Sequence, residues 1–177
     1  QHAVNEPAPN HLFSLALDST LYDSISSIYE HDQSTYVLMA IVERRASNLM
    51  NKHIQYWLDS ADHDLDVAES LFENAKYDWC LFIAHLVLEK TLKAFYVKYK
   101  NDFPPRTHDL VRLSEFVDLE IDEETRDFLD SVNTFNISTR YPDEKLRFYN
   151  LCTKDFAADN FARIKEIRIW ILQKMHR

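Results

Sequence analysis

The chain has 177 residues, of which 46% are hydrophobic, and a formal net charge of −9. This length and composition predict one domain with a substantial core, and the acidic balance argues against a surface devoted to nucleic acid. Glycine is absent, which excludes a P-loop, a dinucleotide-binding GxGxxG loop and a nucleophile elbow, because these motifs need glycine where the backbone turns or approaches phosphate. We expect the loops to use Asn, Asp and Pro instead.

The cysteines and the hydropathy pattern bear on the compartment. Cys80 and Cys152 both lie in apolar sequence without metal-ligand spacing, so we expect reduced thiols in the core of a cytoplasmic protein. No apolar run is long enough for a membrane span, and the first residues lack the features of a secretory signal. The sequence therefore predicts a cytoplasmic location and no membrane partner.

Residues 1–49 differ in character from those that follow. Residues 1–10 carry two prolines and are expected to lack regular structure, whereas 21–30 and 36–45 are each predicted to form a short helix. We interpret 1–49 as an N-terminal extension, either native or added artificially upstream of Met50.

Residues 50–177 are predicted to form an all-α domain. Apolar residues recur at helical spacing in five segments, and no segment alternates with the period of a strand. The expected helices are one from Asn51 to Asn74, one over 79–99 capped by Asp78, a short one capped by Thr107 and ending near Val117, one from Asp122 to the segment 137–143, and one capped by Thr153 that extends to Met175. Together they predict an up-and-down bundle of about five helices.

The segment ISTRYPDEKLRF, residues 137–148, contains a helix break. Pro142 cannot continue a helix, and Tyr141 before it is biased toward an extended conformation. One interpretation is a solvated and capped helix end. The other is a small anion-binding corner formed by Arg140, Tyr141 and Asp143, in which Arg140 would donate two parallel hydrogen bonds to a phosphate.

A second candidate is a locally basic segment. From Glu89 to Arg112 the chain has six basic residues and three acidic ones. Lys90 and Lys93 are three residues apart and share a helix face, and Glu89 is placed to pair with Lys93. The segment is either a solvated helix end or a phosphate-facing surface.

Two histidines accompany this segment. His85 lies in the apolar sequence IAHLVLEK, where a hydrogen-bonded core residue is more frequent than a ligand or a base. His108 stands between Thr107 and Asp109, which either cap the short helix or place His108 beside the basic residues. The chain has no HExxH or CxxC pattern and no recognisable catalytic triad, so no metal or other cofactor is predicted.

Four stretches, in this order, resemble the HEPN family of small helical-bundle proteins: YWLDSADHDLDVAESL, YDWCLFIAHLVLEKTLKAFYV, PPRTHDLVRL and ISTRYPD. The matching positions are Trp57, Ala61, Asp64, Leu65, Ala68, His85, Glu89, Lys90, Leu92, Lys93, Thr107, His108, Asp109, Leu110, Arg140, Tyr141, Pro142 and Asp143. The resemblance covers about residues 52–175. It implies an up-and-down bundle that forms a homodimer and works beside a minimal nucleotidyltransferase, in some pairs as toxin and antitoxin.

The family name refers to proposed nucleotide binding, and many members are ribonucleases that use Arg, four to six residues and then His. No Arg of this chain has a His at that distance, so the metal-independent ribonuclease mechanism lacks its usual residues. We therefore predict a nucleotide- or RNA-binding accessory module of a nucleotidyltransferase, without catalytic activity. The alternatives are a ribonuclease toxin with an atypical site built from Arg140, His108 and His85, and a purely structural interaction protein.

The resemblance and the residue patterns together define a predicted ligand site. In it, Arg140 and Tyr141 face a groove that is also lined by Lys90, Lys93 and His108. The structural alternative is that Arg140 pairs with Glu89 or Asp109 and holds the bundle or its dimer together. The predicted ligand-binding residues are Lys90, Lys93, His108, Arg140, Tyr141, Asp143, His85 and Glu89.

Overall fold

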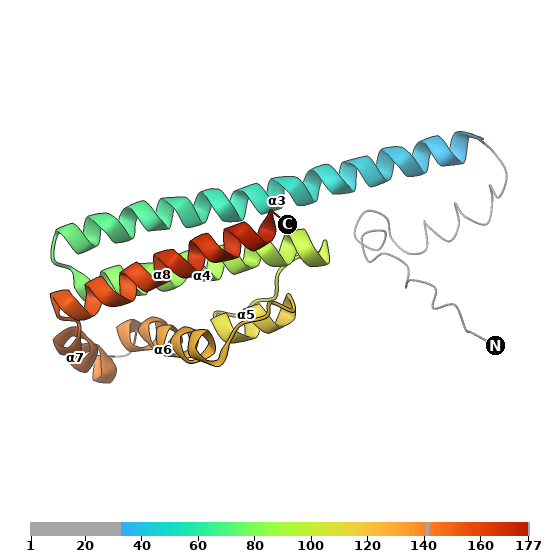
Figure 1. The fold of residues 1–177 in the computed structure, drawn as a ribbon. Helices are drawn as coiled ribbons and strands as arrows, with labels where there is room; N and C mark the ends of the chain where they lie inside the picture. Colours follow the sequence, from blue (N-terminus) through green and yellow to red (C-terminus); the bar gives the residue numbers. More distant parts are fainter. Residues whose placement is uncertain (1–32, 141, 177) are drawn as a thin grey trace, which may run out of the picture. The chain divides into compact units, whose positions relative to one another are not determined.

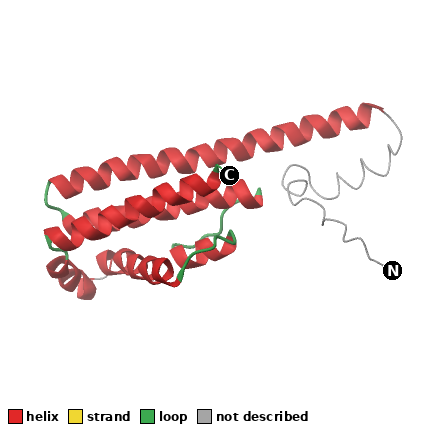
Figure 2. Cartoon of the chain, in the orientation of Figure 1, coloured by secondary structure: helices red, strands yellow, loops and turns green. Residues whose placement is uncertain are grey.

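The structure, a computed structural model, describes residues 33–140 and 142–176, with side chains for 37–136 and 146–176. Every regular element in this part of the chain is a helix, which confirms the all-α prediction (Figure 2). The helices are α3 (Gln33–Glu73), α4 (Tyr77–Lys100), α5 (Leu110–Phe116), α6 (Glu123–Arg140), α7 (Pro142–Leu151) and α8 (Lys154–Met175). The short helix predicted at 21–30 lies outside the described residues.

The chain divides into two units, residues 1–51 and residues 52–177. The prediction of a separate short helix at 36–45 is wrong, because α3 continues without a break from Gln33 through Met50 to Glu73. No glycine or proline occurs in this stretch, so nothing in its backbone chemistry ends the helix. That residues 1–49 are an extension of the domain stays a prediction.

Helix α4 is the centre of the second unit. In its first half, Leu81, Val87 and Leu88 are fully buried. The helix packs against α5, α6, α7 and α8. Within this unit, α5 and α6 lie on the opposite side of α4 from residues 52–73 of α3 (Figure 1). The predicted cap Asp78 is instead a buried residue of the first turn, because the helix begins at Tyr77, two residues earlier than predicted.

Helix α8 starts and packs as the sequence predicts. The Thr153 hydroxyl accepts a hydrogen bond from the Phe156 amide at 3.2 Å, which satisfies one of the free donors at the helix start. Ile164 and Ile171 on its inner face are buried against the core. At its N-terminal half, Phe161 contacts Phe72 of α3, with ring centroids 6.2 Å apart.

Pro142 begins a helix as well as following one. Helix α6 ends at Arg140, as the proline predicts, but α7 starts at Pro142 and was missed in the prediction of about five helices. Proline is favoured at a first helical position, since its missing N–H would have no partner there and its φ is already helical. Phe148 of α7 is buried beside Phe135 of α6, with ring centroids 5.4 Å apart.

Three helix ends turn without glycine. Ala75, Asn101 and Asp118 have positive φ values of 55°, 53° and 51°. After α3, the Lys76 amide donates to the Leu71 carbonyl and the Ala75 amide to the Phe72 carbonyl, which is the Schellman pattern. Asn101 and Asp118 confirm that Asn and Asp replace glycine in the loops, since both residue types tolerate this conformation. Ala75 is an exception to that expectation.

Both cysteines are free thiols in the core. Cys80 of α4 is fully buried and Cys152, just after α7, is nearly so. Burial raises the pKa of each thiol to about 12. No helix in the described part of the chain is long and apolar enough to cross a membrane.

Candidate functional site

The predicted pairing of Glu89 with Lys93 is confirmed. Both side chains stand on the same face of α4, one turn apart, and the Lys93 Nζ atom lies 2.6 Å from the Glu89 Oε1 atom. Both side chains are buried. The Lys93 Nζ atom also lies 5.2 Å from the centroid of the Trp57 ring of α3, which adds a cation–π contact. A lysine that was expected on a surface therefore belongs to a buried ion pair.

The second oxygen of Glu89 holds His108. The Nδ1 atom of His108 lies 2.9 Å from the Glu89 Oε2 atom. Because a carboxylate only accepts hydrogen bonds, Nδ1 carries the proton. The Glu89 side chain is 6% exposed, whereas that of His108 is 59% exposed. Among the described residues no partner contacts the Nε2 atom of His108, so this atom remains available to a ligand.

His85 fixes the backbone beneath His108. Its side chain is fully buried, and its Nε2 atom lies 3.0 Å from the His108 carbonyl oxygen. A carbonyl accepts, so Nε2 is the protonated nitrogen of His85. Its Nδ1 atom is 4.0 Å from the Glu89 Oε2 atom. His85 therefore has the structural role expected of a core histidine, and it positions the loop that carries His108.

The other side of His108 is fixed by α5 and α6. Asp109, and not Thr107, caps α5: its Oδ1 atom accepts a hydrogen bond from the Arg112 amide at 3.1 Å. Asn133 of α6 donates to the same oxygen, and its own Oδ1 atom accepts from the Leu110 amide. The Thr107 hydroxyl instead accepts from the Asp109 amide, just before the helix. His108 is thus held between two anchored neighbours.

Glu89 is charged at the centre of this cluster. Burial by itself raises the pKa of its carboxyl, but hydrogen bonds from Lys93 and His108 outweigh burial, so the pKa lies below its ordinary value. A buried carboxylate needs such partners, since an unpaired charge in the interior is strongly unfavourable. Lys93, Glu89, His108 and His85 therefore form one unit, which we call the Glu89 cluster.

Most of the other basic residues of the segment are occupied by the fold. Lys90 pairs with Asp64 of α3 at 2.6 Å. Lys98 donates to the Met175 carbonyl at the end of α8, and Lys100 pairs with Asp118 at 2.7 Å. The lysines thus tie α4 to its neighbours, a use that the sequence did not distinguish from a phosphate-facing surface.

Arg106 is one of the basic residues of this segment that the predicted site did not include. It is exposed in the loop before His108, and no hydrogen bond or ion pair joins it to another described residue. Its position two residues from His108 was the available signal.

The RYPD part of the predicted site lies outside what the structure describes in atomic detail. Arg140 is the last residue of α6 and Asp143 belongs to the first turn of α7, but their side chains are not described, and neither is Tyr141. Their placement near His108 stays a prediction. Both oxygens of Glu89, the alternative partner of Arg140, already accept hydrogen bonds.

Within residues 33–140 and 142–176, no three side chains form a metal-ligand group.

Comparison with known proteins agrees with this fold. The family model of the HEPN domain matches residues 54–175. The crystal structure of TT1696 from Thermus thermophilus is similar, with a TM-score of 0.59 and 21% sequence identity, over 68% of this chain and 97% of that chain. At this identity the likeness concerns the fold alone. Among curated proteins, none has a significantly similar sequence.

Proposed function

Because the chain belongs to the HEPN domain family, we propose that its helical domain binds a nucleotide or RNA through an anion site centred on His108. The observation that carries this proposal is the exposed imidazole of His108, anchored through Nδ1 to buried Glu89 and accessible at Nε2. A protonated His108 would donate from Nε2 to a phosphate oxygen. Such charge-assisted hydrogen bonds are the strong ones in phosphate recognition.

The surroundings of His108 would supply further donors. Arg106 is exposed in the same loop and carries no partner among the described residues. We propose that Arg140 and Tyr141 complete the site, with a guanidinium fork for phosphate and a phenol for hydrogen bonding or stacking. Lys90 and Lys93 would act only indirectly, because carboxylates already neutralise them.

The proposed partner rests on the resemblance to the HEPN family alone. We propose that the domain serves as a cytoplasmic homodimeric accessory module of a minimal nucleotidyltransferase, in a pair of toxin–antitoxin type. In such a pair the transferase would supply the chemistry, and this chain would present the nucleotide or RNA.

A second candidate function is RNA cleavage. The observation that favours it is the same Nδ1 contact, since a carboxylate that orients an imidazole leaves Nε2 as an acceptor when the ring is neutral. His108 would then take the proton from a ribose 2′-hydroxyl while Arg140 stabilised the charge on phosphorus. This site would differ from the usual Arg and His spacing of the family.

Titration of ATP and of a short single-stranded RNA into the full chain tests the proposal. We expect His108→Ala to weaken binding by about 1.5–3 kcal/mol, the scale of a hydrogen bond to a charged group. His63→Ala, which changes an exposed histidine of α3, is the matched control and should bind as the wild type does. Equal affinity of the two variants would refute a site at His108.

Two further measurements refine the result. Arg140→Ala should weaken binding while Arg140→Lys recovers part of it, because lysine lacks the planar fork. If Arg140 is a structural residue instead, the melting temperature falls and the affinity of the folded protein is unchanged. Cleavage of the RNA by wild type that is lost in both Arg140→Ala and His108→Ala would establish the second candidate.

A further inference from the structure

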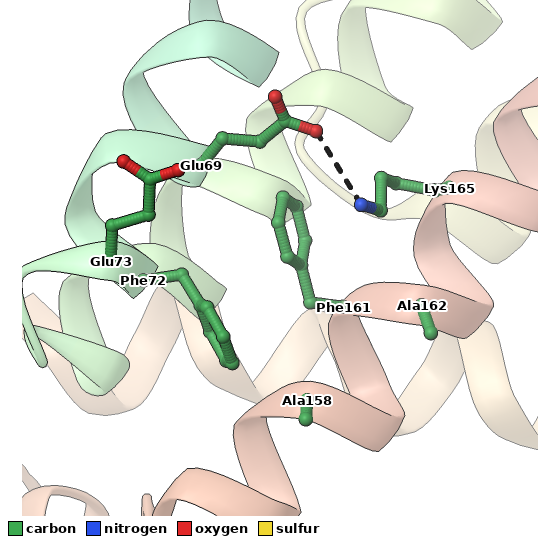
Figure 3. A pocket seen from close by; sticks show the side chains of 7 residues that line it. All are labelled: Glu69, Phe72, Glu73, Ala158, Phe161, Ala162 and Lys165. Carbon is green, nitrogen blue, oxygen red and sulfur yellow. Dashed lines mark hydrogen bonds and ion pairs between the residues drawn. The ribbon is translucent and has the colours of Figure 1, made fainter.

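We propose that a groove between α3 and α8 docks a protein partner through a basic, amphipathic helix of that partner. The groove has a volume of about 390 Å³ and is lined by Glu69, Phe72 and Glu73 from α3 and by Ala158, Phe161 and Ala162 from α8 (Figure 3). We call it the α3–α8 groove. None of its residues belongs to the Glu89 cluster, so this inference goes beyond the proposed anion site.

The floor of the groove is apolar. The rings of Phe72 and Phe161 lie 6.2 Å apart, one from each helix. Ala158 and Ala162 are one turn apart on α8 and contribute only a methyl group each, so at these two positions α8 places no long side chain in the groove (Figure 3). An open apolar floor between two helices suits an apolar side chain of a third helix.

The rim of the groove is acidic. A row of exposed carboxylates follows α3 at alternating spacings of three and four residues, which places them on one face of the helix. Its members are Asp59, Asp62, Asp66, Glu69 and Glu73. The exposed face of α8 adds Asp155 and Asp159 beside the two lining alanines.

The two cations of this face are already engaged. Lys165 lies 3.4 Å from a carboxylate oxygen of Glu69 and sits 4.7 Å from the centroid of the Phe161 ring, so it closes one side of the groove. Arg168 is bound to Asp62. Asp66 and Glu73 have no ion pair with any described residue. The rim therefore keeps uncompensated negative charge beside an apolar floor.

Charge complementarity identifies the occupant. Nucleic acid is excluded because its phosphates would meet carboxylates. A second copy of this chain that used the same face would oppose one acidic rim to another. A helix with lysine or arginine on both sides of an apolar stripe matches both the floor and the rim. The surface therefore fits a basic protein segment.

The test uses the full chain and a fluorescent synthetic peptide of about 18 residues, or five helical turns. The peptide carries leucine along one helical face and lysine and arginine beside it. A second peptide replaces every lysine and arginine with glutamate. Fluorescence anisotropy should show binding of the basic peptide, weakening with salt, and no binding of the acidic one. Absence of binding by the basic peptide, or equal binding of both, would overturn the proposal.

Charge reversal locates the binding. The double variant Asp66→Lys/Glu73→Lys should weaken binding of the basic peptide about tenfold, or about 1.4 kcal/mol. The matched control is Asp127→Lys/Asp130→Lys, which makes the same charge change at exposed positions of α6 and should leave the affinity within about twofold of wild type. Equal weakening by both double variants would mean attraction by net charge alone and would refute the groove.

Filling the groove tests its floor. Ala162→Trp places a large side chain in the groove without a change of charge, and we expect about tenfold weaker binding. Gln173→Trp, at an exposed position of α8, is the control. Unchanged affinity of Ala162→Trp, with an unchanged melting temperature, would contradict the proposal. Nucleotide binding, measured in parallel, should not respond to any of these variants, so the groove and the His108 site are tested separately.

Discussion

Two lysine–glutamate pairs of this protein have the same chemistry and opposite surroundings. In the Glu89 cluster, the Lys93 Nζ atom lies 2.6 Å from Glu89, and both side chains are less than a tenth exposed. At the α3–α8 groove, the Lys165 Nζ atom lies 3.4 Å from Glu69, and both side chains are more than two-fifths exposed. The first pair is enclosed by protein, and the second is surrounded by water.

The difference shows that burial determines whether a charged side chain must keep its partner or can exchange it. Inside the domain, the low dielectric strengthens each interaction and makes an unpaired charge unfavourable, so Glu89 must keep its partners. At the surface, water screens the pair and competes for it, so Glu69 and its neighbours can exchange partners at little loss. Internal charges therefore organise the site at His108, whereas external charges are free for recognition.

The largest effect should come from removing one member of the buried pair. Lys93→Met leaves Glu89 in the interior without its closest cation, and we expect a loss of about 3–5 kcal/mol in the free energy of unfolding. Urea denaturation followed by circular dichroism measures it. A loss below about 1 kcal/mol, the range of surface pairs, would mean that burial does not distinguish the two pairs.

The double variant Glu89→Leu/Lys93→Met sharpens the same comparison. Replacing both charges with apolar groups removes the uncompensated carboxylate, so most of the stability should return. His108, which is more than half exposed, then loses its anchor but remains hydrated. We therefore expect the double variant to be more stable than Lys93→Met but to bind nucleotide more weakly than the wild type. This result would show that the Glu89 cluster serves ligand binding as well as folding.

Acid should produce a smaller loss with a defined sign. The pKa of Glu89 is lower in the folded protein than its ordinary value of 4.5, so the unfolded chain takes up the proton first. The stabilisation by Glu89 is therefore complete above pH 4.5 and is lost as the pH falls through the folded pKa. Urea midpoints should be measured at pH values above and below 4.5. As the pH is lowered, the midpoint should fall more steeply in the wild type than in the Glu89→Leu/Lys93→Met variant. Parallel pH profiles would contradict this assignment.

The smallest effect belongs to the exposed pair. Lys165→Ala should change the free energy of unfolding by about 0–1 kcal/mol, and added salt should reduce the difference further. Thermal melts at low and high salt measure it. If Lys165→Ala were as destabilising as Lys93→Met, the groove would be part of the structural core and a less suitable docking surface.

Local patterns predicted much of the helical fold. The helical spacing of apolar residues predicted the helix over 79–99, and Thr153 was predicted to cap α8. Both features depend on residues that are neighbours in the sequence. The start of α7 at Pro142 was missed, since the same residue also ends α6. Asp109, and not Thr107, caps α5, and Asn133, 24 residues away, also donates a hydrogen bond to its carboxylate. Contacts of this kind cannot be read from local spacing.

The candidate site also combines contacts that local spacing predicts with contacts that depend on the tertiary structure. The Glu89–Lys93 pair follows from a spacing of four residues on one helix and was predicted. The contact of His108 with Glu89 requires the loop to fold back on α4, and the pairing of Lys90 with Asp64 requires α3 beside α4. Lysines of similar appearance in the sequence therefore have different roles, which only tertiary structure distinguishes.

The two core thiols can report local opening of the helical bundle. With a pKa of about 12, a buried thiol at neutral pH is present as the reactive thiolate in only about one molecule in 10⁵. Alkylating reagents therefore modify Cys80 and Cys152 mainly after the core has opened. Because Cys80 lies in α4 and Cys152 between α7 and α8, the order in which the two are labelled reports which part of the bundle separates first. Because both cysteines are already present in the sequence, this experiment needs no engineered cysteine.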